Sequence, residues 1–446
     1  MDIFYRYGEW TIIHNRIDMA QTLKFGNGTW ATKKGSTLAF NDEDGNYKPL
    51  PFTTTRATSA TRVNKEGLIE VVESDRPRID YTDSADGVFL LEKASTNLVT
   101  YEDFTQWTDY NASAVLSEET IYGKNAYKIV EDSTINYHGV YLNNLFTANG
   151  TNYIWSVYVK GGERRYVVLT GRAGISSNDS AVIFDTENGE WVLDISAQNE
   201  AFSAESVGNG WWRIAIEGNP SSGAYDSYTI AASLGGFPYT NANYQGDGTS
   251  GFYVAMAQLE VGSLSSYIPT QGSAVTRVAD TASGSGNSEV FNDSEGVLFV
   301  DIAALADDGT NRRIAISDGD NTDRISIGFT SSNRIQFIVQ SNNSIQVNTS
   351  ITIPEITENT KIAFKYKAND CAFWIDGFEL GTDTIATMPS GLNVFSFDEG
   401  NGGSDFYGNT KEIGYYNTVL TDAELETLTS YRSLSELVTE LNLNTL

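Results

Sequence analysis

The sequence predicts an all-β protein built from tandem β-sandwiches. Apolar and polar residues alternate in many short segments, as in Ile325, Ile327 and Phe329, which is the period-two pattern of a strand with one buried face. Turn signals such as Asn188-Gly189 and Asp376-Gly377 separate these segments, because Asn, Asp and Gly tolerate the positive φ of tight hairpins. A chain of 446 residues is too long for a single core, so two or three domains are expected.

Residues 1–54 show no sustained helical or strand period. Aromatic residues and glycines punctuate them, as in Lys24–Trp30 and Asn41–Asn46, and a segment of this kind needs another surface to pack on. Two interpretations stay open: an attachment region, or a small β-rich cap of the next domain. If the segment is an attachment region, the chain from about residue 99 onward folds without it.

Residues 55–98 are expected to form an extended β connector, beginning in the Thr- and Ser-rich stretch Thr53–Thr61. Three phrases follow: Thr61–Glu70 (TRVNKEGLIE), Pro77–Tyr81 (PRIDY) and Leu90–Leu98 (LLEKASTNL). In their residues and in their order along the chain, these segments closely resemble the segment that leads into the carbohydrate-binding-like jelly rolls of tailed-bacteriophage head-fibre and tail-fibre proteins. Tyr101–Trp107 looks like the opening strand of that jelly roll.

The resemblance implies a virion structural protein, a fibre or decoration that contacts host-surface glycans. It implies that the N-terminal region binds other virion proteins and that the chain is a homo-oligomer, with a trimer favoured. It places the protein in the virion, after synthesis in the host cytoplasm. A secreted or surface bacterial lectin or polysaccharide hydrolase is the alternative, and a head or tail component without a ligand is another.

Residues 99–272 are expected to form the first sandwich. Tyr153, Trp155, Val157 and Val159 alternate with the residues between them, which predicts a strand with one buried face. Residues 181–195 predict a hairpin turned at Asn188-Gly189. The jelly-roll topology follows from the resemblance.

Residues 273–293 are expected to be a linker. Ser273–Ser283 echoes the earlier Thr-rich stretch, and Gly284–Ser288 has the composition of a flexible segment.

Residues 294–432 give a second sandwich. Core faces are predicted along three segments, formed by Ile325, Ile327 and Phe329, by Ile335, Phe337 and Val339, and by Ile362, Phe364 and Tyr366. Glu412–Leu425 resembles the final strand and short helix of laminin-G or concanavalin-like sandwiches. Thr421 and Glu424 have the spacing of a capping box, which predicts the start of that helix.

Residues 433–446 are expected to form a short C-terminal helix. Ser433 and Glu436 have capping-box spacing, and Leu434, Leu437, Val438 and Leu441 make one apolar face. A helix this short is marginal alone in water, so it is expected to dock. Its own sandwich and other copies in an oligomer are both open as partners.

Charge and cysteine content limit the partners and the kind of protein that the sequence is compatible with. The chain has 58 Asp and Glu against 29 Lys and Arg, for a net charge of −29, which disfavours nucleic acid and anionic membranes as partners. Its one cysteine, Cys371, cannot form an internal disulfide. Neither a signal peptide nor an apolar run long enough to span a membrane is visible.

No catalytic motif is found. His14 and His138 are the only histidines, and neither lies in a metal-ligand or triad pattern. The Glu-x-Asp-x-x-Glu strand of many concanavalin-like hydrolases is absent, since Trp374–Glu379 breaks at a turn. We therefore expect a protein that is not an enzyme.

Two tryptophans are candidates for sugar binding. Trp212 shares a strand face with Ile214 and Ile216, whereas Trp211 lies on the opposite face and is expected at the surface. Trp374 faces away from its neighbours Phe373 and Ile375 and is expected to point outward.

Two acidic loops are candidates for calcium, the only cofactor considered. Asp318, Asp320 and Asp323 form one, and Asp398 and Asp405 flank the other. Their oxygens and glycines suit calcium. The alternative is that these residues only form turns by bonding their own backbone.

Overall fold

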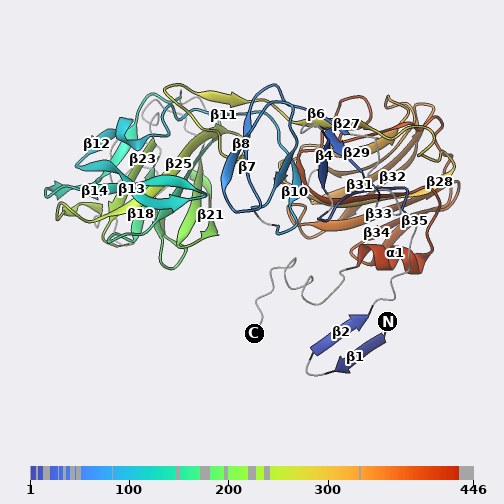
Figure 1. Ribbon diagram of the computed structural model, residues 1–446, viewed down its shortest axis with the longest axis horizontal. Coiled ribbons are helices and arrows are strands. Elements are labelled where there is room, and N and C mark those ends of the chain that lie inside the picture. The colour runs from blue at the N-terminus through green and yellow to red at the C-terminus, as the bar shows by residue number, and fades with distance from the viewer. Residues whose placement is uncertain are drawn as a thin grey trace. The chain divides into compact units, whose positions relative to one another are not determined.

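The computed structural model describes residues 2–6, 9–13, 21–28, 30–33, 37–40, 46, 52–82, 84–146, 151–170, 181–194, 199–218, 228–235, 242–330 and 333–430. The chain forms two compact units (Figure 1). The first comprises residues 1–57, 72–93 and 279–446, and the second residues 58–71 and 94–278. Each unit is built from strands, which confirms the all-β class and the tandem sandwiches.

The first unit is a sandwich of two antiparallel sheets. The eight-stranded sheet has the order β35 (Phe378–Asp383), β34 (Cys371–Ile375), β33 (Thr360–Lys367), β28 (Glu295–Ala304), β37 (Gly408–Tyr416), β10 (Val88–Leu91) and β9 (Arg78–Asp80), with β3 (Leu23–Gly26) also paired to β37. The nine-stranded sheet has the order β32 (Ser344–Thr352), β31 (Arg334–Ser341), β30 (Arg324–Thr330), β29 (Arg312–Ser317), β36 (Val394–Ser396), β27 (Thr281–Ser285), β6 (Phe52–Thr55), β5 (Thr37–Ala39) and β4 (Ala31–Lys33). A separate hairpin joins β1 (Asp2–Arg6) to β2 (Glu9–Ile13).

The core of the first unit lies between these sheets. All nine residues predicted for the core faces of β30, β31 and β33 are buried in it. The opposite face of each strand was expected to be wet, but Arg324 and Lys361 on that face are buried too. The alternation therefore predicts the core face correctly and underestimates what covers the other face.

Residues before position 57 take part in this core. β3 pairs with β37, and β6 pairs with β27. Strands β3 to β6 therefore belong to the last sandwich rather than to the next domain along the chain, and an attachment role for residues 1–54 stays a prediction. Each of these strands has only four residues, which is too short to show a period in the sequence.

Residues 273–293 differ from the expected linker. β26 (Val275–Arg277) pairs with β11 (Ser95–Asn97), and β27 lies inside the nine-stranded sheet. Ser285 is completely buried. The Gly and Ser composition that predicted flexibility instead belongs to an ordered strand and its following turn.

The second unit contains two six-stranded antiparallel sheets. One has the order β12 (Thr108–Tyr110), β16 (Gly139–Leu142), β23 (Tyr228–Ser233), β18 (Tyr166–Thr170), β19 (Ala181–Asp185) and β20 (Glu190–Asp194). The other has the order β13 (Ala112–Ile121), β14 (Lys124–Glu131), β25 (Gly251–Val261), β17 (Tyr153–Lys160), β22 (Trp211–Gly218) and β21 (Asn199–Gly208). The remaining described elements are the pairs β7 (Ala60–Val63) with β8 (Ile69–Val72), β11 with β26, and β15 (Ile135–Asn136) with β24 (Tyr244–Gln245), and a 3-10 helix, η1 (Phe104–Gln106).

The two sheets of the second unit share one core. Tyr153, Trp155, Val157 and Val159 lie in it, as predicted. The other face of β17 is not open to solvent, because Tyr158 packs in a second cluster with Tyr267. The hairpin predicted at Asn188-Gly189 is present between β19 and β20.

One α-helix is found in the described part of the chain, α1 (Asp422–Thr429). The predicted capping box is confirmed: the Thr421 hydroxyl accepts from the Glu424 backbone N–H, and the Glu424 carboxylate accepts from the Thr421 N–H at 2.7 Å. The hairpin predicted at Asp376-Gly377 joins β34 to β35, and both turn residues have positive φ. Residues 433–446, for which a second helix is predicted, lie outside the described residues. Within those residues no helix has the length and apolar character needed to cross a membrane.

Candidate functional site

Trp211 lies on the strand face that the sequence predicts, but it is not at the surface. Its side chain is 2% exposed and packs in a cluster with Tyr158, Met256 and Tyr267. Beside it, the Arg213 guanidinium stacks over the Tyr158 ring at 5.4 Å. The expected exposure is therefore wrong, because segments distant in sequence cover this face of the sheet.

Trp374 does point away from the main core, and it too is covered. Its side chain is 6% exposed and packs with Leu425 of α1. The helix is held against this region by a hydrogen bond of 3.1 Å from the Gly377 N–H to the Thr429 hydroxyl. The ring therefore anchors α1 and offers no open face to a sugar.

The first acidic loop uses its carboxylates on backbone amides. Asp323 is 5% exposed and accepts from the N–H groups of Asn342 at 3.1 Å and Ser390 at 2.8 Å. Asp318 accepts from the Asp320 N–H at 3.1 Å, and Asp320 accepts from the next N–H in the chain. The bonds of Asp318 and Asp320 are the turn bonds that the sequence left open as the alternative to calcium, whereas Asp323 joins its loop to two distant segments.

The second acidic loop is similar. Asp398 accepts from the Ser396 hydroxyl at 2.9 Å and from the Gly400 N–H at 2.5 Å. Asp405 accepts from the Tyr407 hydroxyl at 3.0 Å. Burial raises the pKa of Asp405, the Tyr407 hydrogen bond opposes this, and the nearby Asp398 charge adds to the rise. Among the described residues, no group of three or more His, Cys, Asp or Glu side chains is arranged to hold a metal ion.

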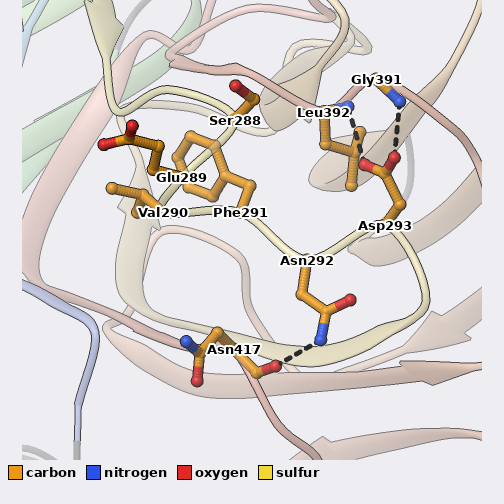
Figure 2. A pocket seen from close by; sticks show the side chains of 9 residues that line it. All are labelled: Ser288, Glu289, Val290, Phe291, Asn292, Asp293, Gly391, Leu392 and Asn417. Carbon is orange, nitrogen blue, oxygen red and sulfur yellow. Dashed lines mark hydrogen bonds between the residues drawn. The ribbon is translucent and has the colours of Figure 1, made fainter.

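A pocket on the first unit gathers polar groups over an apolar floor (Figure 2). Its volume is ≈ 290 Å³, close to the lower end of the range of about 300 to 1,000 Å³ for small-molecule sites. The floor includes Phe291, which is 5% exposed and packs edge-on against Tyr415. The lining residues are Ser288, Glu289, Val290, Phe291, Asn292, Asp293, Gly391, Leu392 and Asn417.

Hydrogen bonds fix the shape of this pocket. Figure 2 shows the Asp293 carboxylate accepting from the N–H groups of Gly391 at 2.8 Å and Leu392 at 2.9 Å. It also shows the Asn292 side-chain amide donating to the Asn417 carbonyl at 2.8 Å. These bonds join the segment after β27 to the loops before β36 and after β37.

Two buried tyrosines support Asn292 from below. The Tyr366 hydroxyl donates to the Asn292 carbonyl at 2.7 Å, and the Asn292 N–H donates to the Tyr415 hydroxyl at 2.9 Å. Burial raises the pKa of both hydroxyls, so they stay protonated at neutral pH. The pocket wall is thus built before any ligand arrives.

The groups left facing solvent in the pocket are of the kind that binds sugars. Ser288, Glu289 and Asn417 are exposed at its rim. A carboxylate accepts from hydroxyl groups, and a side-chain amide both donates and accepts. The sequence prediction missed Ser288 and Glu289 because it assigned the segment 273–293 to a linker, and it missed Asn417 because a local pattern does not show that this distant loop meets that segment. The Asn292-Asp293 pair, a turn signal directly before a strand, was the available clue.

One comparison with known proteins, the family match, agrees with the fold of the first unit. Residues 302–426 match the family model of the concanavalin A-like lectin/glucanases superfamily, of the laminin G type. This match lies within the predicted second sandwich, residues 294–432, so that part of the chain is a concanavalin-like domain. No curated protein sequence matches the chain.

Solved structures give weaker similarities. A carbohydrate-binding module (CBM40) of the Ruminococcus gnavus IT-sialidase, bound to α2,3-sialyllactose, has 16% identity and a TM-score of 0.28, covering 32% of this chain and 86% of the module. Domain 4 of the extracellular arabinanase AbnA from Geobacillus stearothermophilus, in complex with arabinotriose, has 14% identity and a TM-score of 0.28, covering 38% and 82%. A SAP-like pentraxin from Limulus polyphemus has 14% identity and a TM-score of 0.24, covering 31% and 71%. These likenesses are too weak to support an assignment of function.

Proposed function

We propose that this protein is a glycan-binding structural component of a tailed-bacteriophage virion, a fibre or decoration without catalytic activity. The pocket of the first unit carries the glycan part of this proposal. There, exposed carboxylate and amide groups at Glu289 and Asn417 stand over the apolar floor that contains Phe291.

The chemistry of the pocket fits a sugar ring. Hydroxyl groups of the ring bond to Glu289 and Asn417, and the less polar C–H face rests on Val290, which is half-buried. Because Asp293 already accepts hydrogen bonds from two backbone amides, it stabilises the shape of the pocket and does not bind the ligand. We propose binding rather than cleavage for this reason: Glu289 is the only carboxylate among the lining residues that is not so engaged.

The phrases between Thr61 and Leu98 support the virion part of the proposal, since they resemble those of phage fibre proteins. We propose that residues 1–54 also contact other virion proteins and that the chain assembles as a homotrimer. A fibre with several copies would raise the avidity of a shallow, weak glycan site.

A glycan array probed with the full chain tests the glycan part. We expect binding to surface glycans that falls strongly in Glu289→Gln and Asn417→Ala. The matched control is Glu358→Gln, which makes the same chemical change at an exposed position of the same unit. Binding that is equal in all three variants would remove the pocket from the proposal.

The virion part is tested by electron microscopy of particles labelled with an antibody against this chain, and by light scattering of the purified protein. We expect label on intact particles and the mass of a trimer. Glycan binding by a protein that is absent from particles would support a secreted or surface lectin instead. Label on particles without any glycan binding would support a purely structural head or tail component.

A further inference from the structure

The nine-stranded sheet carries buried charges on the face that points away from the core. Arg313 of β29 and Arg324 of β30 are 8% and 6% exposed. Their neighbours in the strands, Ile314 and Ile325, lie in the core, so both arginines lie on the opposite face. Ser326 of β30 is on that face as well and is completely buried. This surface is formed by residues other than those of the pocket.

The two guanidinium groups converge on one carboxylate. Glu399, in the loop after β36, places its Oε2 atom 3.6 Å from Arg313 Nε and 3.8 Å from Arg324 Nη1. Both distances are too long for hydrogen bonds. Arg313 reaches this position by lying over Gly328, where an added Cβ atom would come within 3.0 Å of the Arg313 Cγ atom.

Other contacts of the arginines fix their orientation. Several guanidinium N–H groups nevertheless have no hydrogen-bond partner among the described residues. Arg313 Nη2 donates to Gln336 Oε1 at 2.6 Å, and Arg324 Nη1 donates to the Glu399 carbonyl at 3.1 Å. Arg313 Nε and Nη1, Arg324 Nε and the Ser326 hydroxyl are buried and have no hydrogen-bond partner among the residues that the structure describes. Leaving such groups unpaired in a buried place is destabilising.

The charge balance at this place is also incomplete. Two cations share one carboxylate. Burial lowers the pKa of Arg313, the Arg324 charge lowers it further, and Glu399 only partly opposes both. Burial likewise lowers the pKa of Arg324 against the effect of Glu399. A further negative charge would therefore be stabilised here, on a chain whose net charge of −29 repels anions elsewhere.

We propose that Arg313, Arg324 and Ser326 form a binding site for the oxyanion group of a ligand, in particular the carboxylate of an acidic sugar. A planar carboxylate matches the fork of a guanidinium and can accept two parallel N–H bonds. Glu399 is the internal occupant of this site, held at distances that make no hydrogen bond to either guanidinium side chain. A ligand carboxylate that reaches the free N–H groups and the Ser326 hydroxyl makes the bonds that Glu399 does not.

The loop is built so that the Glu399 side chain can give way while its backbone stays. The Arg313 N–H donates to the Ser404 carbonyl at 2.9 Å, and the Glu399 N–H donates to the Gly403 carbonyl at 2.8 Å. These bonds hold the loop across the sheet. The Glu399 side chain is 23% exposed and has the Ser404 hydroxyl as another partner at 3.3 Å. Rotation toward solvent therefore opens the site without unfolding the loop.

The test is calorimetric titration of the full chain with glucuronate and with glucose at constant ionic strength. These sugars differ only in a carboxylate in place of a hydroxymethyl group. We expect saturable binding of glucuronate that is lost in Arg324→Gln and weakened at least tenfold in Arg313→Lys, which keeps the charge and removes the fork. Glucose titrations should not change in either variant.

The decisive variant is Glu399→Gln, which removes the competing charge and keeps the shape. We expect it to bind glucuronate about tenfold more tightly, equivalent to about 1.4 kcal/mol, whereas Glu358→Gln leaves binding unchanged. If Glu399 were only a structural partner of the arginines, this variant would be less stable and would bind no better. That result would overturn the proposal, and it does not require Arg324→Gln to fold.

Two further arms separate this site from the pocket and from unspecific anion binding. Sulfate that competes with glucuronate at equal concentration would show a general oxyanion site, and failure of sulfate to compete would show selectivity for a sugar carboxylate. Loss of glucuronate binding in Glu289→Gln, with no effect of the arginine variants, would transfer the binding to the pocket and overturn the arginine site. Glucuronate binding that survives in Glu289→Gln supports the arginine site whether or not the pocket binds glycans.

Discussion

Arg56 donates a hydrogen bond of 2.7 Å to the carboxylate of Asp280, although the two residues are 224 positions apart in the sequence. Asp280 also accepts from the Arg78 guanidinium and from the Glu92 N–H, and Glu92 accepts from Arg78 at 2.6 Å. All four residues belong to the first unit and are buried. Three stretches of chain that enter this unit separately are thus joined by one ionic cluster.

This cluster gives a structural reason for part of the sequence segments that resemble phage fibre proteins. Arg78 lies in the phrase Pro77–Tyr81, and Glu92 lies in the phrase Leu90–Leu98. Burial by itself lowers the pKa of Arg78, but Glu92 and Asp280 together raise it above its ordinary value. The arginine therefore stays charged, and its two carboxylate partners are required to compensate it.

The first prediction concerns Asp280. In Asp280→Asn, two buried guanidinium groups lose a charged partner, so we expect the free energy of unfolding of the first unit to fall by about 3 to 5 kcal/mol. Urea denaturation followed by tryptophan fluorescence measures this. The control is Glu73→Gln, which breaks an exposed pair with Arg76 at 3.7 Å and should cost less than about 1 kcal/mol. Equal effects of the two variants would contradict a stabilising role for the cluster.

The second prediction concerns the early strands. Phe52 of β6 is completely buried, with its ring 4.6 Å from Phe25 of β3 and 5.2 Å from Phe395. Phe52→Ala should destabilise the first unit by about 3 to 5 kcal/mol. Phe378→Ala is the matched control, because Phe378 is 68% exposed, and it should stay within about 0.5 kcal/mol of the wild type.

The same packing reverses the expectation that the chain from about residue 99 folds alone. A chain that begins near Thr96 lacks β3, β6, β9 and β10, and with them Phe25, Phe52 and Phe89 of the core. We expect its first unit to remain unfolded while the core of the second unit still forms. Cooperative unfolding of both units in this truncated chain would show that the early strands are dispensable.

Local pattern was sufficient where a strand is long enough to repeat and faces the core. Ile325, Ile327 and Phe329 were found in this way, and so was the helix start at Thr421. The pattern also gave the correct face for Trp211 and Trp374. It failed to show that each face is covered, because the covering residues, such as Leu425 of α1 over Trp374, come from elsewhere in the chain. The pocket was missed because residues 273–293 were assigned to a linker and meet loops distant in sequence, and the arginine site was missed because Glu399 comes from a loop far from Arg313 and Arg324.

The third prediction is a pH dependence centred on Glu131 in the second unit. This side chain is buried and accepts from Arg164 Nε at 2.8 Å, the Tyr244 hydroxyl at 2.6 Å and the Asp247 N–H at 2.9 Å. Burial raises the pKa of Glu131. These hydrogen bonds and the Arg164 charge lower it by more, so the net pKa lies below the ordinary 4.5.

The lowered pKa of Glu131 makes the second unit less stable at acidic pH. Below the ordinary pKa the unfolded chain binds a proton at Glu131 that the folded chain does not, so stability falls with decreasing pH. The contribution is fully present above pH 4.5 and is lost as the pH drops through the folded pKa. We expect urea denaturation of Glu131→Gln to show a weaker pH dependence in this range, with Glu118→Gln, an exposed residue, behaving as the wild type. An unchanged slope in Glu131→Gln would contradict the assignment.

The fourth prediction separates the role of Trp374 from glycan binding. Since its ring is buried against α1, Trp374→Phe should lower the free energy of unfolding by about 1 to 3 kcal/mol and leave glycan-array binding unchanged. Glu289→Gln should show the opposite behaviour, with weaker binding and little change in stability. Loss of binding in a folded Trp374→Phe variant would return Trp374 to the list of sugar-binding residues.

The last prediction concerns calcium. The carboxylates of Asp318, Asp320, Asp323 and Asp398 accept from backbone N–H groups, and that of Asp405 accepts from a tyrosine hydroxyl. A calcium ion would have to compete with these hydrogen bonds for the carboxylates. We therefore expect melting curves with millimolar calcium and with chelator to overlay, whereas Asp323→Asn lowers the melting temperature equally in both. A calcium concentration of about ten times a millimolar-range Kd would raise the melting temperature by a few degrees if calcium bound. Such an increase would restore the calcium sites that the sequence predicts.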